Sequence, residues 1–110
     1  MRVGELYWVV LPARGGHAQA GRRPAMIAQQ VTNLSTVLIV PLTSQQDSLR
    51  FPATVFIEAD NTNGLLLDSV ALVFQLTAID KRYLADRLGE IAPVVIDQIW
   101  QALDELTGRA

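Results

Sequence analysis

Short apolar runs separated by polar turns dominate the first two thirds of the chain. Residues 6–11 are β-branched and aromatic and end at Pro12, which predicts a strand. The continuous apolar run at 36–40 is typical of a strand buried on both faces, and the Asp-Asn-Thr-Asn-Gly sequence at 60–64 predicts a turn. Further strands are predicted at 53–57, 69–74 and 76–79, whereas the apolar run at 25–28 fits a strand or a helix.

The last third of the chain changes to helical spacing. Asp80 can cap a short helix in which Leu84 and Leu88 lie four residues apart, and Gly89 can end it. Pro93 suits the first turn of a second helix. That helix carries one apolar stripe and can end at Gly108; the stripe consists of Ile96, Ile99, Trp100, Leu103 and Leu106.

Together these elements predict an α+β fold. Many short strands followed by a terminal helix indicate a small twisted barrel with the helix packed on it. The polar segment between Thr43 and Pro52 is expected to be a mobile loop. A length of 110 residues is typical of one domain, so residues 1–110 are expected to form a single unit.

Composition excludes some classes of function and favours others. Half of the residues are hydrophobic, which fits an oligomer interface as well as it fits a well-filled core. The net charge is -2, but residues 1–50 carry five positive and two negative side chains. A local basic patch can bind phosphates, whereas avid nonspecific nucleic-acid binding is not expected. The chain has no cysteine, no signal peptide and no membrane-length apolar run, which suits a cytoplasmic protein.

The candidate chemistry begins in a glycine-punctuated basic loop at 14–24. Its glycines at 15, 16 and 21 let the backbone approach a ligand, and an arginine fork can hold two phosphate oxygens. Arg14, Arg22 and Arg23 supply the charge; Pro24 biases Arg23 to extended backbone. His17, the only histidine, can act as a general acid or base. A solvated connection between strands remains the alternative for this loop.

Hydroxyl and aromatic side chains add weaker candidates. Thr43 and Ser44 follow the predicted buried strand and can either donate to a phosphate oxygen or cap the loop backbone. Trp8 and Tyr7 alternate in a strand, so one of them can serve as a base-stacking platform or pack in an interface. One histidine and scattered carboxylates predict no transition-metal site.

Four motifs, in order, give the chain a family resemblance. They are Gly4-Glu5-Leu6-Tyr7-Trp8-Val9-Val10, Gln19-Ala20-Gly21-Arg22-Arg23-Pro24, Val40-Pro41-Leu42-Thr43-Ser44, and Gly64-Leu65 with Asp68-Ser69-Val70 and Gln75-Leu76-Thr77-Ala78-Ile79-Asp80-Lys81-Arg82. The second motif matches Gln-x-Gly-x-Arg-Pro, and nearly the whole chain is covered. The chain therefore resembles the MazF/PemK family of toxin endoribonucleases from type II toxin–antitoxin systems.

The resemblance implies an SH3-like barrel of the CcdB/MazF type and a homodimer paired with a cognate antitoxin. It also implies metal-independent cleavage of single-stranded RNA without any cofactor, through attack by the RNA 2′-hydroxyl. By this resemblance, Arg23 matches the family's catalytic arginine and Thr43 matches its phosphate-contacting threonine. His17 lies where some members carry a histidine that is proposed to assist catalysis or bind RNA. Gln19 and Gly21 would shape the loop. The further RNA-binding candidates are Arg14, Arg22, Ser44 and Gln75.

The chain departs from the family pattern at three positions. Ala18 replaces a common glutamate, while Leu72 and Phe74 replace an arginine and an aspartate of some members. His17 is therefore the best remaining candidate for the general base. Two alternatives stay open, namely a non-enzymatic toxin of the same fold that binds a protein such as DNA gyrase, and a member that keeps antitoxin binding without cleavage.

Overall fold

Strands and one C-terminal α-helix form the part of the chain that the structure describes. The structure is a computed structural model that describes residues 1–11, 21–30 and 32–109. Its strands are β1 (Glu5–Leu11), β2 (Gly21–Ile27), β3 (Thr36–Thr43), β4 (Thr54–Ile57), β5 (Ser69–Leu72), β6 (Thr77–Asp80) and β7 (Leu84–Glu90). The helix is α1 (Pro93–Thr107), and the short 3₁₀ helices are η2 (Gln46–Arg50), η3 (Val73–Gln75) and η4 (Lys81–Tyr83).

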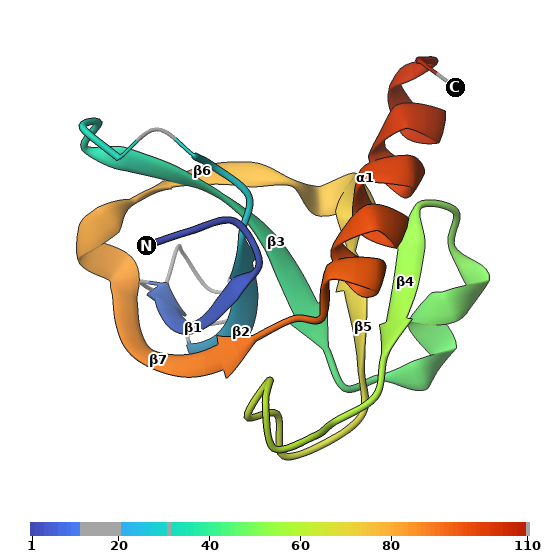
Figure 1. The fold of residues 1–110 in the computed structure, drawn as a ribbon, viewed down its shortest axis with the longest axis horizontal. Coiled ribbons are helices and arrows are strands. Elements are labelled where there is room, and N and C mark those ends of the chain that lie inside the picture. Colours follow the sequence, from blue (N-terminus) through green and yellow to red (C-terminus); the bar gives the residue numbers. More distant parts are fainter. Residues whose placement is uncertain (12–20, 31, 110) are drawn as a thin grey trace, which may run out of the picture.

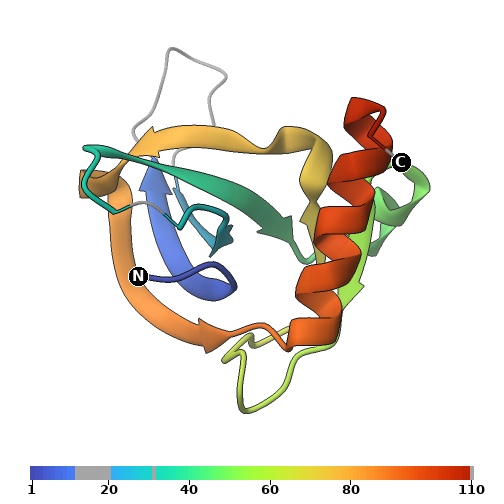
Figure 2. The same ribbon diagram turned by 45° about the horizontal axis from the view of Figure 1, so that its top comes forward.

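The strands form one curled antiparallel sheet around the long strand β3. The order is β4-β5-β3-β2-β1-β7, and β6 also pairs with β3. β3 pairs with β2 and β6 along its first part and with β5 at Leu42 and Thr43, so it passes from one half of the sheet to the other. In Figures 1 and 2 the sheet curls without joining β4 to β7, and α1 lies beside β4. This is the twisted, barrel-like α+β arrangement that the sequence predicts.

Alternate residues of the central strands feed two hydrophobic clusters. Met26 of β2 packs in the larger cluster, which includes Ile99 of α1, whereas Ala25 and Ile27 pack in the smaller one. This division follows from the two-residue period of a strand, which sends successive side chains to opposite faces. The strand that carries the candidate arginines is therefore held on both faces by buried side chains.

Several predicted elements are confirmed. The uncertain run at 25–28 belongs largely to strand β2, and the stripe of the second helix packs through Ile99, which is fully buried. Gly108 ends α1 in the left-handed region, with φ of 82°. The 60–64 turn is closed by the Gly64 N–H, which donates to the Asp60 carbonyl at 3.1 Å.

The predicted helix between Asp80 and Gly89 is wrong. Asp80 does cap, because its side chain accepts from the Arg82 N–H, but the helix that it caps is only η4. The chain then forms β7, which pairs with β1. A spacing of four residues between Leu84 and Leu88 fits a strand as well as a helix, so the pattern was ambiguous and long-range pairing decided it.

Two smaller expectations also need correction. The strand at 36–40 is not buried on both faces throughout, because Leu38 is 37% exposed where β3 pairs with the short strand β6. The expected loop between Thr43 and Pro52 contains the 3₁₀ helix η2, which contacts β4 and β5.

Candidate functional site

Arg23 and Thr43 lie just beyond the point where β2 and β3 stop pairing. β2 and β3 are paired from Ile27 and Ile39 to Ala25 and Pro41. If this antiparallel register continued by two residues, it would align Arg23 with Thr43. β3 leaves β2 at this point to pair with β5, where Thr43 lies opposite Val70. The two strands thus open a gap beside the two polar side chains.

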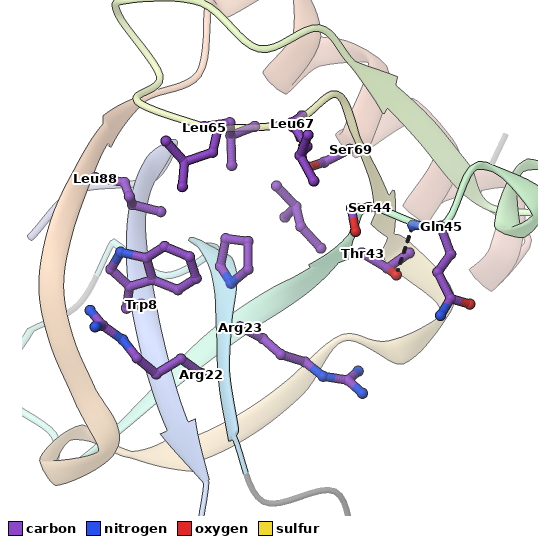
Figure 3. A pocket seen from close by; sticks show the side chains of 13 residues that line it. Trp8, Arg22, Arg23, Thr43, Ser44, Gln45, Leu65, Leu67, Ser69 and Leu88 are labelled. Carbon is purple, nitrogen blue, oxygen red and sulfur yellow. Dashed lines mark hydrogen bonds between the residues drawn. The ribbon is translucent and has the colours of Figure 1, made fainter.

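A cavity of about 300 Å³ occupies this place between the strands. One side is polar and the other is apolar, and the residues that line it come from β1, β2, β3, β5, β7 and the segments that follow β3 and precede β5 (Figure 3). The polar lining consists of Arg22, Arg23, Thr43, Ser44, Gln45 and Ser69, and the apolar lining of Trp8, Pro24, Leu42, Leu65, Leu66, Leu67 and Leu88. Such a cavity suits a ligand with a charged group and a flat apolar part.

Arg22 is held against the indole of Trp8. Its guanidinium carbon lies 4.8 Å from the ring centroid, and one of its nitrogens lies 3.6 Å from a carboxylate oxygen of Asp86. Trp8 pairs with Pro24, so Arg22 is the diagonal neighbour of Trp8 across the two strands. The tryptophan that sequence analysis treated as a stacking or interface candidate therefore orients an arginine at the cavity.

Arg23 is exposed and unpaired within the described part of the chain. No hydrogen bond or ion pair joins its guanidinium to residues 1–11, 21–30 or 32–109. In Figure 3 it points away from Trp8, toward the side of β2 on which Thr43 and Gln45 lie. Thr43 Oγ1 accepts from the Gln45 N–H at 3.2 Å, which leaves the hydroxyl proton of Thr43 to donate elsewhere. A cation and a hydroxyl donor thus face the same open space.

The apolar side of the cavity depends on a close contact between two distant segments. Asn63 is buried and joins the 60–64 turn through hydrogen bonds to Glu58, Asp60 and Leu65. A Cβ on Gly89 would lie 2.2 Å from the carbonyl oxygen of Thr62, so only glycine lets β7 approach the turn this closely. Sequence analysis missed this side of the cavity because the contact joins residues far apart in the chain.

The predicted site residues fall into three groups. Arg22, Arg23, Thr43 and Ser44 line the cavity, and Gly21 begins β2 beside them. Gln75 is exposed in η3 and does not line the cavity. Arg14, His17, Ala18 and Gln19 lie outside the described residues.

The two departures from the family pattern at positions 72 and 74 have different environments. Leu72 is 6% exposed and packs inside the sheet region, so an apolar side chain fits its position. Phe74 is 37% exposed and its ring centroid lies 5.7 Å from that of Phe51.

The described residues contain neither a cluster of metal ligands nor a membrane-spanning helix. Within residues 1–11, 21–30 and 32–109 no group of three or more His, Cys, Asp or Glu side chains gathers as a metal site. Over the same residues, no helix has the length and apolar character that crossing a membrane requires.

Comparison with known proteins places the chain among toxins. The family model described as PemK-like, MazF-like toxin of type II toxin–antitoxin system matches residues 2–107. Endoribonuclease MazF2 of Mycobacterium bovis is 31% identical over 103 residues, covering 90% of each chain. Endoribonuclease EndoA of Bacillus subtilis is 30% identical over 103 residues, covering 91% of this chain and 88% of the relative.

A solved structure agrees with the sequence comparisons. The structure of MazE–MazF from Deinococcus radiodurans superposes with a TM-score of 0.79 at 27% identity, covering 100% of this chain and 97% of that chain. The similarity therefore extends over all of the strands and the terminal helix.

Proposed function

The chain belongs to the PemK-like, MazF-like family of type II toxins, and we propose that it is an endoribonuclease that cleaves single-stranded RNA and thereby inhibits growth. The observation that carries this proposal is that the guanidinium of Arg23, which has no partner among residues 1–11, 21–30 and 32–109, lines the same open cavity as Thr43. Two relatives of the chain are named endoribonucleases, which supports the same activity.

The chemistry needs no group beyond the RNA and the protein. The 2′-oxygen of the RNA forms a bond to phosphorus, and the bond from phosphorus to the 5′-oxygen breaks. The products are a 2′,3′-cyclic phosphate and a free 5′-hydroxyl. The nucleophile loses a proton to a base, and the leaving oxygen gains one. Negative charge builds up on the phosphorane oxygens in between, and this is the charge that a fixed cation stabilises.

Arg23 and Thr43 suit the two electrostatic tasks. The Arg23 fork would contact two phosphorane oxygens, and no partner among residues 1–11, 21–30 and 32–109 has to be displaced first. Thr43 would donate its hydroxyl to a phosphate oxygen. Because the described lining of the cavity contains no carboxylate, His17 remains our candidate for the base that takes the 2′-hydroxyl proton.

The remaining candidates would bind the RNA around the scissile phosphate. Arg22 and Ser44 line the cavity and would contact neighbouring phosphates or sugars. Gln75, on η3, would contact a nucleotide outside the cavity. Arg14, Gln19 and Gly21 complete our set of RNA-binding residues through the family motif.

We place the protein in the cytoplasm as a homodimer with two partners, RNA and a cognate antitoxin. A complex named MazE–MazF is among the similar solved structures. An acidic, partly disordered antitoxin segment would suit the two exposed arginines, because it competes with the phosphates for the same charge.

Replacement of Arg23 by alanine tests the catalytic assignment. The purified protein is incubated in EDTA with a long single-stranded RNA beside Arg23→Ala and the control Arg109→Ala, which removes an exposed arginine from the end of α1 that does not line the cavity. We expect defined fragments with 5′-hydroxyl ends from the wild type and the control. The Arg23→Ala rate should fall about 10²- to 10⁴-fold, equivalent to about 3–5 kcal/mol at the transition state. Equal rates for Arg23→Ala and Arg109→Ala would refute the role of Arg23, and intact RNA with the wild type would refute the function.

A further inference from the structure

An exposed aromatic pair lies on the surface outside the cavity. Phe51 is 42% exposed and Phe74 is 37% exposed. Their ring centroids are 5.7 Å apart and their planes are inclined by 56°, so the rings touch without covering each other's faces. Neither ring covers both faces of the other, so part of the aromatic surface stays open to a flat ligand.

The backbone around the pair is fixed by hydrogen bonds and by one strained residue. Ala53 has a φ of 56°, which is uncommon for any residue other than glycine. Its carbonyl accepts from the Phe74 N–H at 3.3 Å, and the Phe51 carbonyl accepts from Thr54 Oγ1 at 2.9 Å. The left-handed turn at Ala53 thus joins the segment of Phe51 to that of Phe74. Strain that is retained where it shapes an exposed surface is often linked to function.

The pair is connected to the cavity through η2. Gln45 lines the cavity and directly precedes η2, while Phe51 directly follows it. Five residues of 3₁₀ helix extend for about 10 Å, so the aromatic pair lies near enough for the same nucleic-acid strand to reach both. The first residue of η2 is tied to the far side of the cavity, because Gln46 Nε2 donates to the Asp68 carbonyl at 3.1 Å.

A cation accompanies the rings. The guanidinium carbon of Arg50 lies 4.9 Å from the centroid of Phe51. Asp47, three residues earlier on η2, is also exposed, but no ion pair joins it to Arg50 in the described part of the chain. Arg50 is therefore available to a phosphate while its aliphatic stem lies along the ring.

We propose that Phe51 and Phe74, together with Arg50, bind an unpaired nucleobase of the RNA and its phosphate, as a second contact next to the cavity. This inference rests on the proposed ribonuclease function. Aromatic faces accept any base by stacking, and an adjacent arginine adds attraction to the backbone.

Two leucine substitutions test the proposal against a matched control. Phe51→Leu and Phe74→Leu keep an apolar side chain but remove the ring. Phe56→Leu makes the same change at another exposed phenylalanine, 43% exposed on β4. The substrate is an RNA oligomer that spans a site cleaved by the wild type, and kcat/KM is measured for all four proteins after urea unfolding shows that each is folded.

We expect Phe51→Leu and Phe74→Leu to lower kcat/KM about 5- to 100-fold and Phe56→Leu to change it less than twofold. Phe74→Trp should keep kcat/KM near the wild-type value, since it keeps an aromatic ring at this position. Oligomers with a single abasic nucleotide at successive positions provide a second reading. When the missing base is the one that stacks on the pair, kcat/KM of the wild type should fall to the value of Phe74→Leu. The kcat/KM of Phe74→Leu should be the same with and without that base.

Three outcomes would overturn the proposal. If all leucine variants cleave like the wild type, the pair does not contact the RNA, and the ribonuclease function still stands. If Phe51→Leu or Phe74→Leu instead changes the oligomeric mass in light scattering, the pair is a contact between protein chains. If the wild type does not cleave RNA at all, the proposed function fails and this inference fails with it.

Discussion

Alanine in place of Gly89 should damage both stability and the shape of the cavity. The backbone of Gly89 has an ordinary conformation, so the effect would be purely steric. The added Cβ would lie 2.2 Å from the Thr62 carbonyl oxygen and 2.7 Å from the Asn63 carbonyl carbon. Both atoms belong to the backbone and cannot rotate away, so β7 must move from the 60–64 turn.

The cost can be estimated from two contributions. Forcing a methyl group into a filled space costs about 1–3 kcal/mol. The separation also weakens the hydrogen bond from the Glu90 N–H to the Thr62 carbonyl, 3.0 Å in the native protein, which is worth about 1 kcal/mol. We therefore expect a loss of about 2–4 kcal/mol in the free energy of unfolding. Since Leu65 and Leu88 line the cavity, a displacement here should also lower RNA cleavage about 10- to 100-fold.

Gly108→Ala is the matched control for this prediction. Gly108 has a φ of 82° with no atom within 4 Å of an added Cβ, so its substitution introduces conformational strain without a clash. We expect a loss of about 1 kcal/mol and unchanged cleavage. Urea unfolding followed by tryptophan fluorescence gives the free energies, and kcat/KM gives the activity. If Gly89→Ala loses no more stability than Gly108→Ala, the close approach of β7 to the turn is not what holds this side of the cavity.

Two further predictions concern stability. Burial raises the pKa of Glu5, but hydrogen bonds from Arg87 and from the Arg2 N–H, together with the N-terminal charge, outweigh that effect, so the net pKa is below its ordinary value. The folded state therefore gains stability above the unfolded pKa of about 4.3 and loses it as the pH falls through the folded pKa. We expect Glu5→Gln to lower the free energy of unfolding by about 1–2 kcal/mol at pH 7, which is at the low end for a charged hydrogen bond because Arg87 is 42% exposed. In urea unfolding at low pH, this difference from the wild type should vanish. A difference that persists at low pH, or an equal loss in the exposed control Glu58→Gln, would contradict the ion pair. Ala53→Val should lower the free energy of unfolding by about 1–2 kcal/mol, because a β-branched residue is poorly tolerated at positive φ. Ala53→Gly should change it by no more than about 0.5 kcal/mol. Equal unfolding free energies for the two variants would show that the turn is not strained.

Local sequence patterns were sufficient for the elements that carry their own signals. The stripe on α1, with Pro93 at its start and Gly108 at its end, predicts both the helix and its length, because capping and periodicity act within one segment. β7 could not be predicted in this way. Leu84 and Leu88 satisfy both periods, and the choice of strand over helix depends on pairing with β1, some 80 residues earlier.

The candidate site likewise has a part that the sequence predicts and a part that it does not. Arg23, Thr43 and Ser44 were predicted because each lies at a strand end in a recognisable motif, and the structure brings them to one cavity. The apolar side, formed by Leu65 to Leu67 with Leu88, has no local signal, because it results from a contact between two glycine-containing segments. Trp8 was predicted only as an aromatic of uncertain role, since its contact with Arg22 requires the register of β1 with β2.

Two hollows of the described surface are lined by charges of opposite sign. The described lining of the cavity contains Arg22 and Arg23 and no carboxylate. A second groove, between β4 and α1, has Glu58 and Glu105 in its described lining and no cation. Charges more than about 10 Å apart are largely screened at physiological salt, so a net charge of -2 does not prevent phosphate binding at the cavity. At short range the arginines at the cavity therefore attract an anion, whereas the groove repels one.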